Sequence, residues 1–203
     1  RVTRDANEVS LRVTASLAMR WLIPRLDDFR ARHSRIRVSL ETFAEPTPMS
    51  EHDVDLAIAY SRGKPIRRGA EKLVDDCCGI YASPGLIERE SVIGLADLVR
   101  LPLLGATQDD WDWQVWCKAH GVDMADLSFP HRFDVDDAAI AAAQAGLGVV
   151  LATAMFVERE LAAGSLVAMP GCPELDVGAY WLLLSPTGLL WKRRVPVSPW
   201  GIS

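Results

Sequence analysis

The first sixty residues alternate between short apolar runs and one longer stretch with helical spacing. Three runs have the length and pattern of strands: residues 11–14, 36–43 and 54–60. Between the first two, Leu22, Leu26 and Phe29 fall at i, i+4 and i+7, which is the stripe of an amphipathic helix over residues 16–34. This order of strand, helix and strand predicts a right-handed crossover and a mostly parallel sheet.

The alternation returns after a long strand-like run at residues 72–84. Helices are expected at residues 93–100, 109–121, 136–148 and 155–164, and strands at 101–104, 131–135, 149–154 and 178–186. We therefore predict an α/β fold with two Rossmann-like lobes. The outer lobe comprises residues 11–74 and 169–203, the inner lobe comprises residues 75–168, and residues 1–10 end a linker. Two crossings of the chain make a hinge, and a ligand is expected in the cleft between the lobes.

Composition limits the kinds of partner. The net charge is -5 and the pI is about 5.4, so the whole chain lacks the basic character that phosphate binding requires. The sequence also lacks the run of about 20 apolar residues that a membrane span needs. Because the chain begins with Arg1, a leader or a further domain is expected upstream.

The cysteines and histidines show no spacing typical of a cofactor or metal site. Cys77, Cys78, Cys117 and Cys172 form no C-x-x-C pair, so a disulfide framework is not expected. Adjacent Cys77 and Cys78 should point to opposite faces of a strand as small buried residues, with a redox sensor as the alternative. The four histidines also lack metal-ligand spacing, so neither a metal nor a cofactor is predicted.

Several motifs together resemble one family. They are LRVTASLAMRWLIPRLDDF (11–29), VDLAIAY (54–60), AAQAGLGV (142–149), LAAGSLV (161–167) and GAYW (178–181). In order and spacing they resemble the effector-binding domain of LysR-type bacterial transcriptional regulators, over about residues 9–185. GAYW resembles the branch that includes regulators of glycine cleavage and of β-lactamase induction.

The resemblance implies the architecture of type 2 periplasmic-binding proteins, with an effector cleft between two lobes. It also implies a winged helix-turn-helix upstream, which would be the only part that contacts DNA. The family forms dimers and tetramers, in which the helix at residues 19–33 of one chain would pack beside the inner lobe of another.

The carboxyl-terminal tail departs from the family pattern. Family members usually end in an amphipathic helix, whereas Pro186, Pro196 and Pro199 leave little room for one here. The basic run Lys192–Arg194 is interpreted as a solvated surface segment, with phosphate binding as the alternative.

The resemblance implies effector contacts at seven residues: Ser16, Leu17, Thr42, Phe43, Val135, Asp136 and Tyr180. Helix starts at Ser16 and Asp136 would present free N–H groups to an anionic group, and Asp136 could hold an amine. The alternatives are that Ser16 and Asp136 only cap their helices, and that Thr42, Phe43 and Tyr180 only pack.

Two further features of the inner lobe are expected to be structural. Gly146 and Gly148 should end a helix in a turn with positive φ, because they follow the helix, whereas the glycines of a dinucleotide fingerprint precede one. Trp113 and Trp116 share a helix face and are assigned to packing in preference to ligand stacking.

The sequence thus favours a cytoplasmic effector-sensing domain of a LysR-type regulator. Its partners would be a small polar metabolite, either amino-acid-like or carrying a carboxylate, and further copies of the chain, with no membrane contact. The alternative is a periplasmic solute-binding protein without its signal peptide, although four unpaired cysteines oppose an oxidising compartment. An enzyme is not predicted, because the sequence has no nucleophile elbow, phosphate-binding loop or metal cluster.

Overall fold

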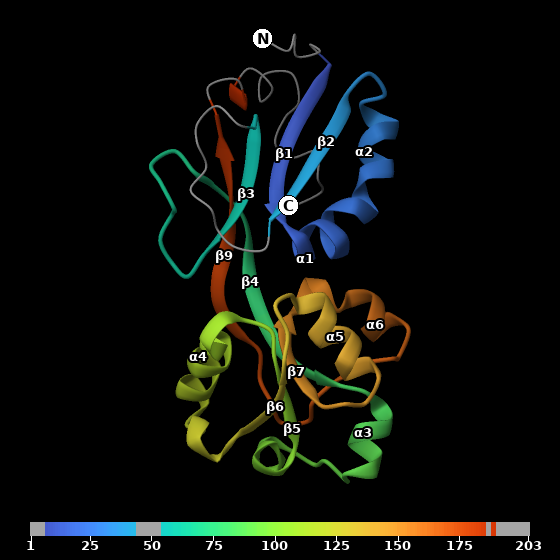
Figure 1. Ribbon diagram of the computed structural model, residues 1–203, viewed down its shortest axis with the longest axis vertical. Helices are drawn as coiled ribbons and strands as arrows, with labels where there is room; N and C mark the ends of the chain where they lie inside the picture. Colours follow the sequence, from blue (N-terminus) through green and yellow to red (C-terminus); the bar gives the residue numbers. More distant parts are fainter. Residues whose placement is uncertain (1–6, 44–53, 186–187, 190–203) are drawn as a thin grey trace. The chain divides into compact units, whose positions relative to one another are not determined.

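The computed structural model describes residues 7–43, 54–185 and 188–189. The chain divides into two compact units (Figure 1). Unit 1 comprises Arg1–Asp75 and Gly178–Ser203, and unit 2 comprises Asp76–Val177. The chain therefore passes from one unit to the other inside two strands, β4 (Glu71–Ala82) and β9 (Leu175–Leu184).

Unit 1 contains the parallel arrangement that the sequence predicted. Its strands follow the order β2-β1-β3-β9, where β1 is Glu8–Thr14, β2 is Arg37–Phe43 and β3 is Leu56–Ser61. Strand β1 is parallel to both β2 and β3, and β9 is antiparallel to β3. The first strand begins three residues earlier than expected, at Glu8. The tail that contains Lys192–Arg194 lies outside the described residues.

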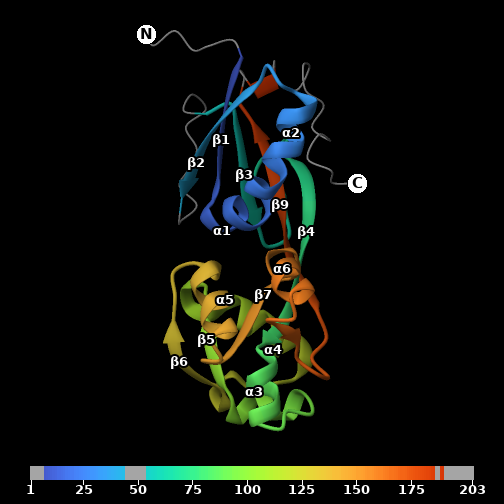
Figure 2. The same ribbon diagram turned by 90° about the vertical axis from the view of Figure 1, so that its right-hand side faces the viewer.

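The prediction of one regular helix over residues 16–34 is wrong, because the segment is divided into four short helical turns of different types. The segment consists of α1 (Ala15–Leu17), a π-helical turn η1 (Ala18–Leu22), a 3₁₀ turn η2 (Ile23–Arg25) and α2 (Leu26–Arg32). The 3₁₀ turn η2 contains Pro24, which has no N–H to donate and whose ring crowds the preceding turn. Figures 1 and 2 show the segment along one side of β1 and β2, where Leu22 and Phe29 are buried.

Unit 2 contains the remaining strands of the same nine-stranded sheet, in the order β4-β7-β5-β6. Strands β5 (Pro102–Gly105), β6 (Ser128–Arg132) and β7 (Val149–Thr153) are linked by parallel pairing through β5. Strand β4 is antiparallel to β7 and to the short β8 (Val167–Ala168). The expected strand at residues 131–135 is displaced, because Ser128 and His131 pair with β5, and Val135 caps the next helix.

Three α-helices of unit 2, α4 (Trp111–His120), α5 (Asp136–Gln144) and α6 (Glu158–Ala162), lie where the sequence predicted helices and are shorter than expected. The helix α3 (Pro84–Arg89) was not predicted, and the segment expected as a helix at residues 93–100 is a 3₁₀ turn, η3 (Leu95–Arg100). The other 3₁₀ turns are η4 (Gln108–Asp110), η5 (Met124–Asp126) and η6 (Ala154–Phe156). In the described part of the chain, every helix is too short or too polar to cross a lipid bilayer.

The tryptophans of α4 form the centre of the unit 2 core, as the sequence predicted. Trp113 and Trp116 are fully buried, and their rings meet edge to face with centroids 6.4 Å apart. Each indole N–H has a partner: Trp113 Nε1 donates to the carbonyl oxygen of Leu104 at 3.3 Å, and Trp116 Nε1 donates to that of Pro173 at 2.9 Å. Large aromatic groups with satisfied N–H donors are well suited to a core.

The two glycines after α5 have different roles. The predicted positive-φ turn is confirmed for Gly146 and wrong for Gly148. Gly146 has φ +76°, and its N–H and that of Leu147 bond back to Ala143 and Ala142, which is a Schellman ending. Gly148 is required for close approach instead. A Cβ there would lie 2.5 Å from the carbonyl oxygen of Pro102 and 3.0 Å from a methyl carbon of Leu104.

We expect Gly148→Ala to lower the free energy of unfolding by about 1–3 kcal/mol, because β7 would have to move away from β5. Gly85→Ala is the matched control, since Gly85 lies in α3 with nothing within 4 Å of an added Cβ. Urea unfolding should show the control to be neutral or more stable by up to about 1 kcal/mol. Equal stability of the two variants would contradict the close approach.

Candidate functional site

Four of the seven predicted contact residues lie at, or just after, the carboxyl ends of two parallel strands in unit 1. Strands β1 and β2 end side by side, with Thr14 opposite Phe43 and Val13 opposite Thr42. Ser16 and Leu17 come next along the chain from β1, in α1. Parallel pairing therefore brings Ser16, Leu17, Thr42 and Phe43 to one edge of the sheet, here called the carboxyl edge of unit 1.

These four residues differ in accessibility. Ser16 and Leu17 are buried, Phe43 is half-buried and Thr42 is exposed. The alternative that Ser16 caps its helix is wrong, because Thr14 occupies the N-cap position and makes no side-chain cap hydrogen bond. The exposed hydroxyl of Thr42 is the group at this edge most available to solvent.

Tyr180 reaches the same edge from β9. It lies opposite Tyr60 in the antiparallel pair of β3 and β9, and the two rings meet edge to face with centroids 5.3 Å apart. The register of β3 against β1, with Leu11 opposite Leu56, puts Tyr60 just beyond the level of Thr14. Tyr180 is buried and packs against Tyr60. Its register places it at the carboxyl edge of unit 1 as well.

Val135 and Asp136 occupy the corresponding edge of unit 2. They follow the carboxyl end of β6, and β6 is parallel to β5. The interpretation of Asp136 as an N-cap is wrong, because Val135 is the N-cap and Asp136 is the first residue of α5. Asp136 and Asp137 in the first turn have the charge that a helix start favours.

The structure adds a polar group at this edge that sequence reasoning missed. Thr107, just beyond the end of β5, donates from Oγ1 to Asp112 Oδ1 at 2.6 Å, and the N–H of Trp113 donates to the same oxygen at 2.9 Å. Burial raises the pKa of the Asp112 carboxyl, and these two hydrogen bonds, which lower it, offset that effect only in part. The available signal was the position of Thr107 after a strand.

An ion pair supports the backbone between Thr107 and Asp112. Asp109 and Asp110 both have left-handed φ, at +59° and +48°, which is an uncommon conformation for residues other than glycine. The side chain of Asp110 is buried and pairs with Arg132 at the end of β6. This ion pair joins the loop after β5 to the end of β6.

A second buried carboxylate lies where β4 meets the carboxyl end of β7. Cys78 is opposite Thr153 in this pair, and its thiol donates to Asp76 Oδ1 at 3.7 Å. Burial and the charges of Asp76, Asp112 and Asp136 all raise the pKa of the Cys78 thiol. All three carboxylates therefore act on the same thiol; Asp76 and Asp112 are buried, whereas Asp136 is half-buried.

This arrangement favours a cationic group. Carboxylates held near one another in partly buried surroundings are stabilised by a positive charge such as an ammonium. In the described part of the chain, no three His, Cys, Asp or Glu side chains are placed to hold a metal ion. This edge, here called the acidic edge of unit 2, therefore carries negative charge that an ammonium group would offset.

Comparison with known proteins identifies the family. The model of the LysR substrate binding domain matches residues 3–193. The chain is a LysR substrate-binding domain. Its α/β fold is the type 2 periplasmic-binding-protein fold of LysR effector domains, which confirms the predicted fold class and family.

Several relatives of the domain are named transcriptional regulators. The transcriptional activator AmpR of Pseudomonas aeruginosa is 32% identical over 163 residues, covering 80% of this chain and 54% of that protein. The regulator PerR of Escherichia coli is 34% identical over 178 residues, covering 85% and 56%. The Escherichia coli glycine cleavage system activator is 31% identical, covering 87% and 56%. The domain spans just over half the length of these relatives.

Solved structures agree with this assignment. The effector domain of Pseudomonas aeruginosa AmpR superposes with a TM-score of 0.77 at 27% identity, covering 92% of each chain. The regulatory domain of CrgA from Neisseria meningitidis has a TM-score of 0.77 at 18% identity, with 97% and 98% covered, and so supports the fold alone.

The cysteines of the domain are free thiols, and their raised pKa values disfavour the thiolate. Burial raises the pKa of Cys117 and of Cys172 to about 11, and burial together with Glu174 raises that of Cys77 to about 11. Only the thiolate is a good nucleophile, so these values oppose a redox sensor. The expected burial holds for Cys78, whereas Cys77 is half-buried and its thiol donates to Glu174 Oε2 at 3.4 Å.

We expect Asp112→Asn to become more stable than the parent chain as the pH rises. A carboxyl whose pKa is raised on folding favours the folded state below its ordinary value of about 3.9, and that contribution is lost as the pH rises through the raised value. Asparagine can still accept from Thr107 and Trp113 but carries no charge. Urea unfolding from pH 4 to pH 8 should show the difference growing in favour of the variant. A difference that is constant with pH would contradict the raised pKa.

Proposed function

We propose that this LysR substrate-binding domain is the effector sensor of a cytoplasmic transcriptional regulator. The observation that supports this most strongly is the family match over residues 3–193, together with relatives that are named transcriptional activators. DNA would be contacted through a winged helix-turn-helix outside this chain. The domain would work as a homodimer or tetramer, without membrane contact and without a cofactor.

We further propose that the effector is a small polar metabolite with an amine and a carboxylate, such as an amino acid. The acidic edge of unit 2, with Asp136 at the start of α5, suits the amine. The helix start after β1, with Ser16 and the exposed hydroxyl of Thr42, suits the carboxylate through N–H and O–H donors. Leu17, Phe43, Val135 and Tyr180 would supply the apolar and aromatic contacts.

The signal would be a shift between two conformational populations. A ligand changes an equilibrium only by its difference in affinity for the two states. An effector that contacts residues from both units would favour the state in which both sets of contacts form at once. Packing between copies would then change, and the spacing of the DNA-binding segments with it.

The alternatives have less support. A periplasmic solute-binding protein would share the fold, but the relatives that exceed 30% identity are regulators. An enzyme is also disfavoured, because the named relatives are regulators. In addition, raised pKa values of the Asp112 carboxyl and of the four thiols disfavour their charged, nucleophilic forms.

The proposal predicts stabilisation of the domain by its effector in a thermal-shift screen of amino acids, aromatic acids and peptidoglycan fragments. A ligand at 100 times its dissociation constant adds about 2.7 kcal/mol to the free energy of unfolding. The shift should fall sharply in Asp136→Asn if an amine is bound there, and in Ser16→Ala if the helix start holds the carboxylate.

Glu88→Gln provides the matched control. Glu88 is exposed on α3 and its substitution removes one negative charge, as Asp136→Asn does. The control should retain the full shift. A hit that all three variants retain would overturn the assignment of the site, and saturable turnover of any compound that Ser16→Ala abolishes would overturn the sensor.

A further inference from the structure

The two units carry opposite charge. Unit 1 contains 17 Lys and Arg against 11 Asp and Glu, which gives +6. Unit 2 contains 5 Lys and Arg against 16 Asp and Glu, which gives -11. The net charge of -5 therefore conceals a basic unit and a strongly acidic unit.

Part of the positive charge of unit 1 is concentrated in the loop between β3 and β4, here called the basic loop (residues 61–70). Its sequence, SRGKPIRRGA, contains four cations and no Asp or Glu. The local charge of +4 lies within seven residues, from Arg62 to Arg68. Such a concentration raises the potential at one place on the surface more than scattered charges do.

The basic loop is held in shape by its own contacts. Arg67 Nη2 donates to the carbonyl oxygen of Leu184 on β9 at 2.6 Å, and the N–H of Ala70 donates to the carbonyl of Arg67 at 3.2 Å. Gly63 and Gly69 take positive φ, at +146° and +85°, where the chain turns. One arginine is thus used to anchor the loop to the sheet, and a preorganised loop loses little entropy on binding.

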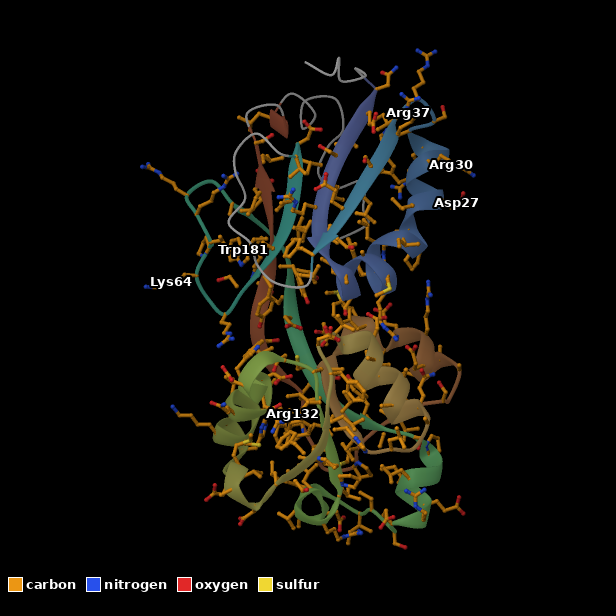
Figure 3. The ribbon with its side chains drawn as sticks, viewed as in Figure 1. Asp27, Arg30, Arg37, Lys64, Arg132 and Trp181 are labelled. Carbon is orange, nitrogen blue, oxygen red and sulfur yellow. The ribbon has the colours of Figure 1, made fainter. Side chains whose placement is uncertain are left out.

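Two other cations of the loop are left for a partner. Lys64 and Arg68 are exposed, and neither forms an ion pair with any described residue. Figure 3 shows Lys64 on the loop, pointing away from β3 and β4. Between these two cations Ile66 is 45% exposed, so the loop presents an apolar side chain flanked by positive charge.

We propose that the basic loop of one copy docks on the acidic surface of unit 2 of a second copy. The chain itself supplies the complementary charge, since Asp123 and Asp126 at η5 of unit 2 are exposed and have no cationic partner among the described residues. Ile66 would be buried at the centre of the contact, with Lys64 and Arg68 around it. The inference goes beyond the homo-oligomer of the proposed function by naming a contact surface for it.

Nucleic acid is a poorer partner for this loop. A phosphate backbone attracts Lys64 and Arg68 but offers no apolar surface to Ile66. It would also repel the charge of -11 on unit 2 of the same chain. A second copy satisfies the charges of both units and buries the isoleucine.

The first test is sedimentation velocity of the 203-residue chain over a concentration series, at 50 and 500 mM NaCl. Lys64→Gln/Arg68→Gln should raise the dissociation constant for self-association roughly tenfold at 50 mM, which is the scale expected for two exposed ion pairs. The difference should vanish at 500 mM, where salt screens exposed charges.

Arg35→Gln/Arg37→Gln is the matched control. These arginines are exposed in unit 1, Arg35 just before β2 and Arg37 at its start, and Figure 3 shows Arg37 there. The substitution changes the net charge by the same amount as the loop variant. The control should associate like the parent chain. A chain that stays monomeric at every concentration, or a control that weakens association as much as the loop variant, would overturn the proposal.

A carbodiimide cross-linking experiment then identifies the contact. Carbodiimide joins an amine directly to a carboxylate, so Lys64 should become linked to acidic residues of unit 2. In a mixture of ¹⁴N- and ¹⁵N-labelled chains, mass spectrometry separates links between copies from links within one copy. Links of Lys64 within one copy only would contradict docking on a second copy.

A final arm distinguishes nucleic acid from the second copy. Fluorescence anisotropy with a 40-base-pair duplex should show no binding that the loop variant alone loses. Salt-dependent DNA binding that is lost in Lys64→Gln/Arg68→Gln, with self-association unchanged, would replace the proposed partner by DNA. Effector stabilisation is available to a monomer, so the thermal-shift result stands or falls separately.

Discussion

Parallel strand pairing is the constraint on which the rest of the structure depends. A parallel pair cannot be joined by a tight turn, so each pair requires a crossover, and the crossover leaves from the carboxyl end of a strand. In unit 1 this puts Ser16 beside Thr42 and Phe43, and in unit 2 it puts Asp136 beyond β6. Within each unit, topology thus gathers the residues proposed to contact the effector from positions far apart along the chain.

The acidic edge of unit 2 is maintained at an energetic cost. Buried Asp76 and Asp112 lose hydration, and hydrogen bonds from Thr107 and Trp113 compensate Asp112 only partly, as its raised pKa indicates. The well-packed tryptophans of α4 lie directly beside Asp112 and supply stability that can tolerate such a cost. A cation close to these carboxylates would offset part of this cost.

Sequence reasoning recovered what depends on local pattern. The order of strands and helices, the burial of Trp113 and the Gly146 stop all follow from periodicity and from side-chain chemistry. It failed where a neighbour distant in sequence decides. Gly148 must be glycine because the backbone of Pro102 lies so close to it. The strand before α5 lies earlier in the sequence than expected, because pairing with β5 sets its position. The hydrogen bond between Thr107 and Asp112 depends on the left-handed backbone of the two residues that precede Asp112.

The net charge of the chain likewise hides how the charges are distributed over its two units. A net charge of -5 argues against a phosphate partner only if the charge is spread evenly, and here it is not. The argument holds for unit 2, whereas unit 1 is basic and presents Lys64 and Arg68 without partners among the described residues. Opposite charges on the two units make a second copy of the chain electrostatically complementary to the first. Electrostatic attraction of this kind mainly sets the encounter rate and the orientation, and burial of an apolar residue such as Ile66 then holds the contact.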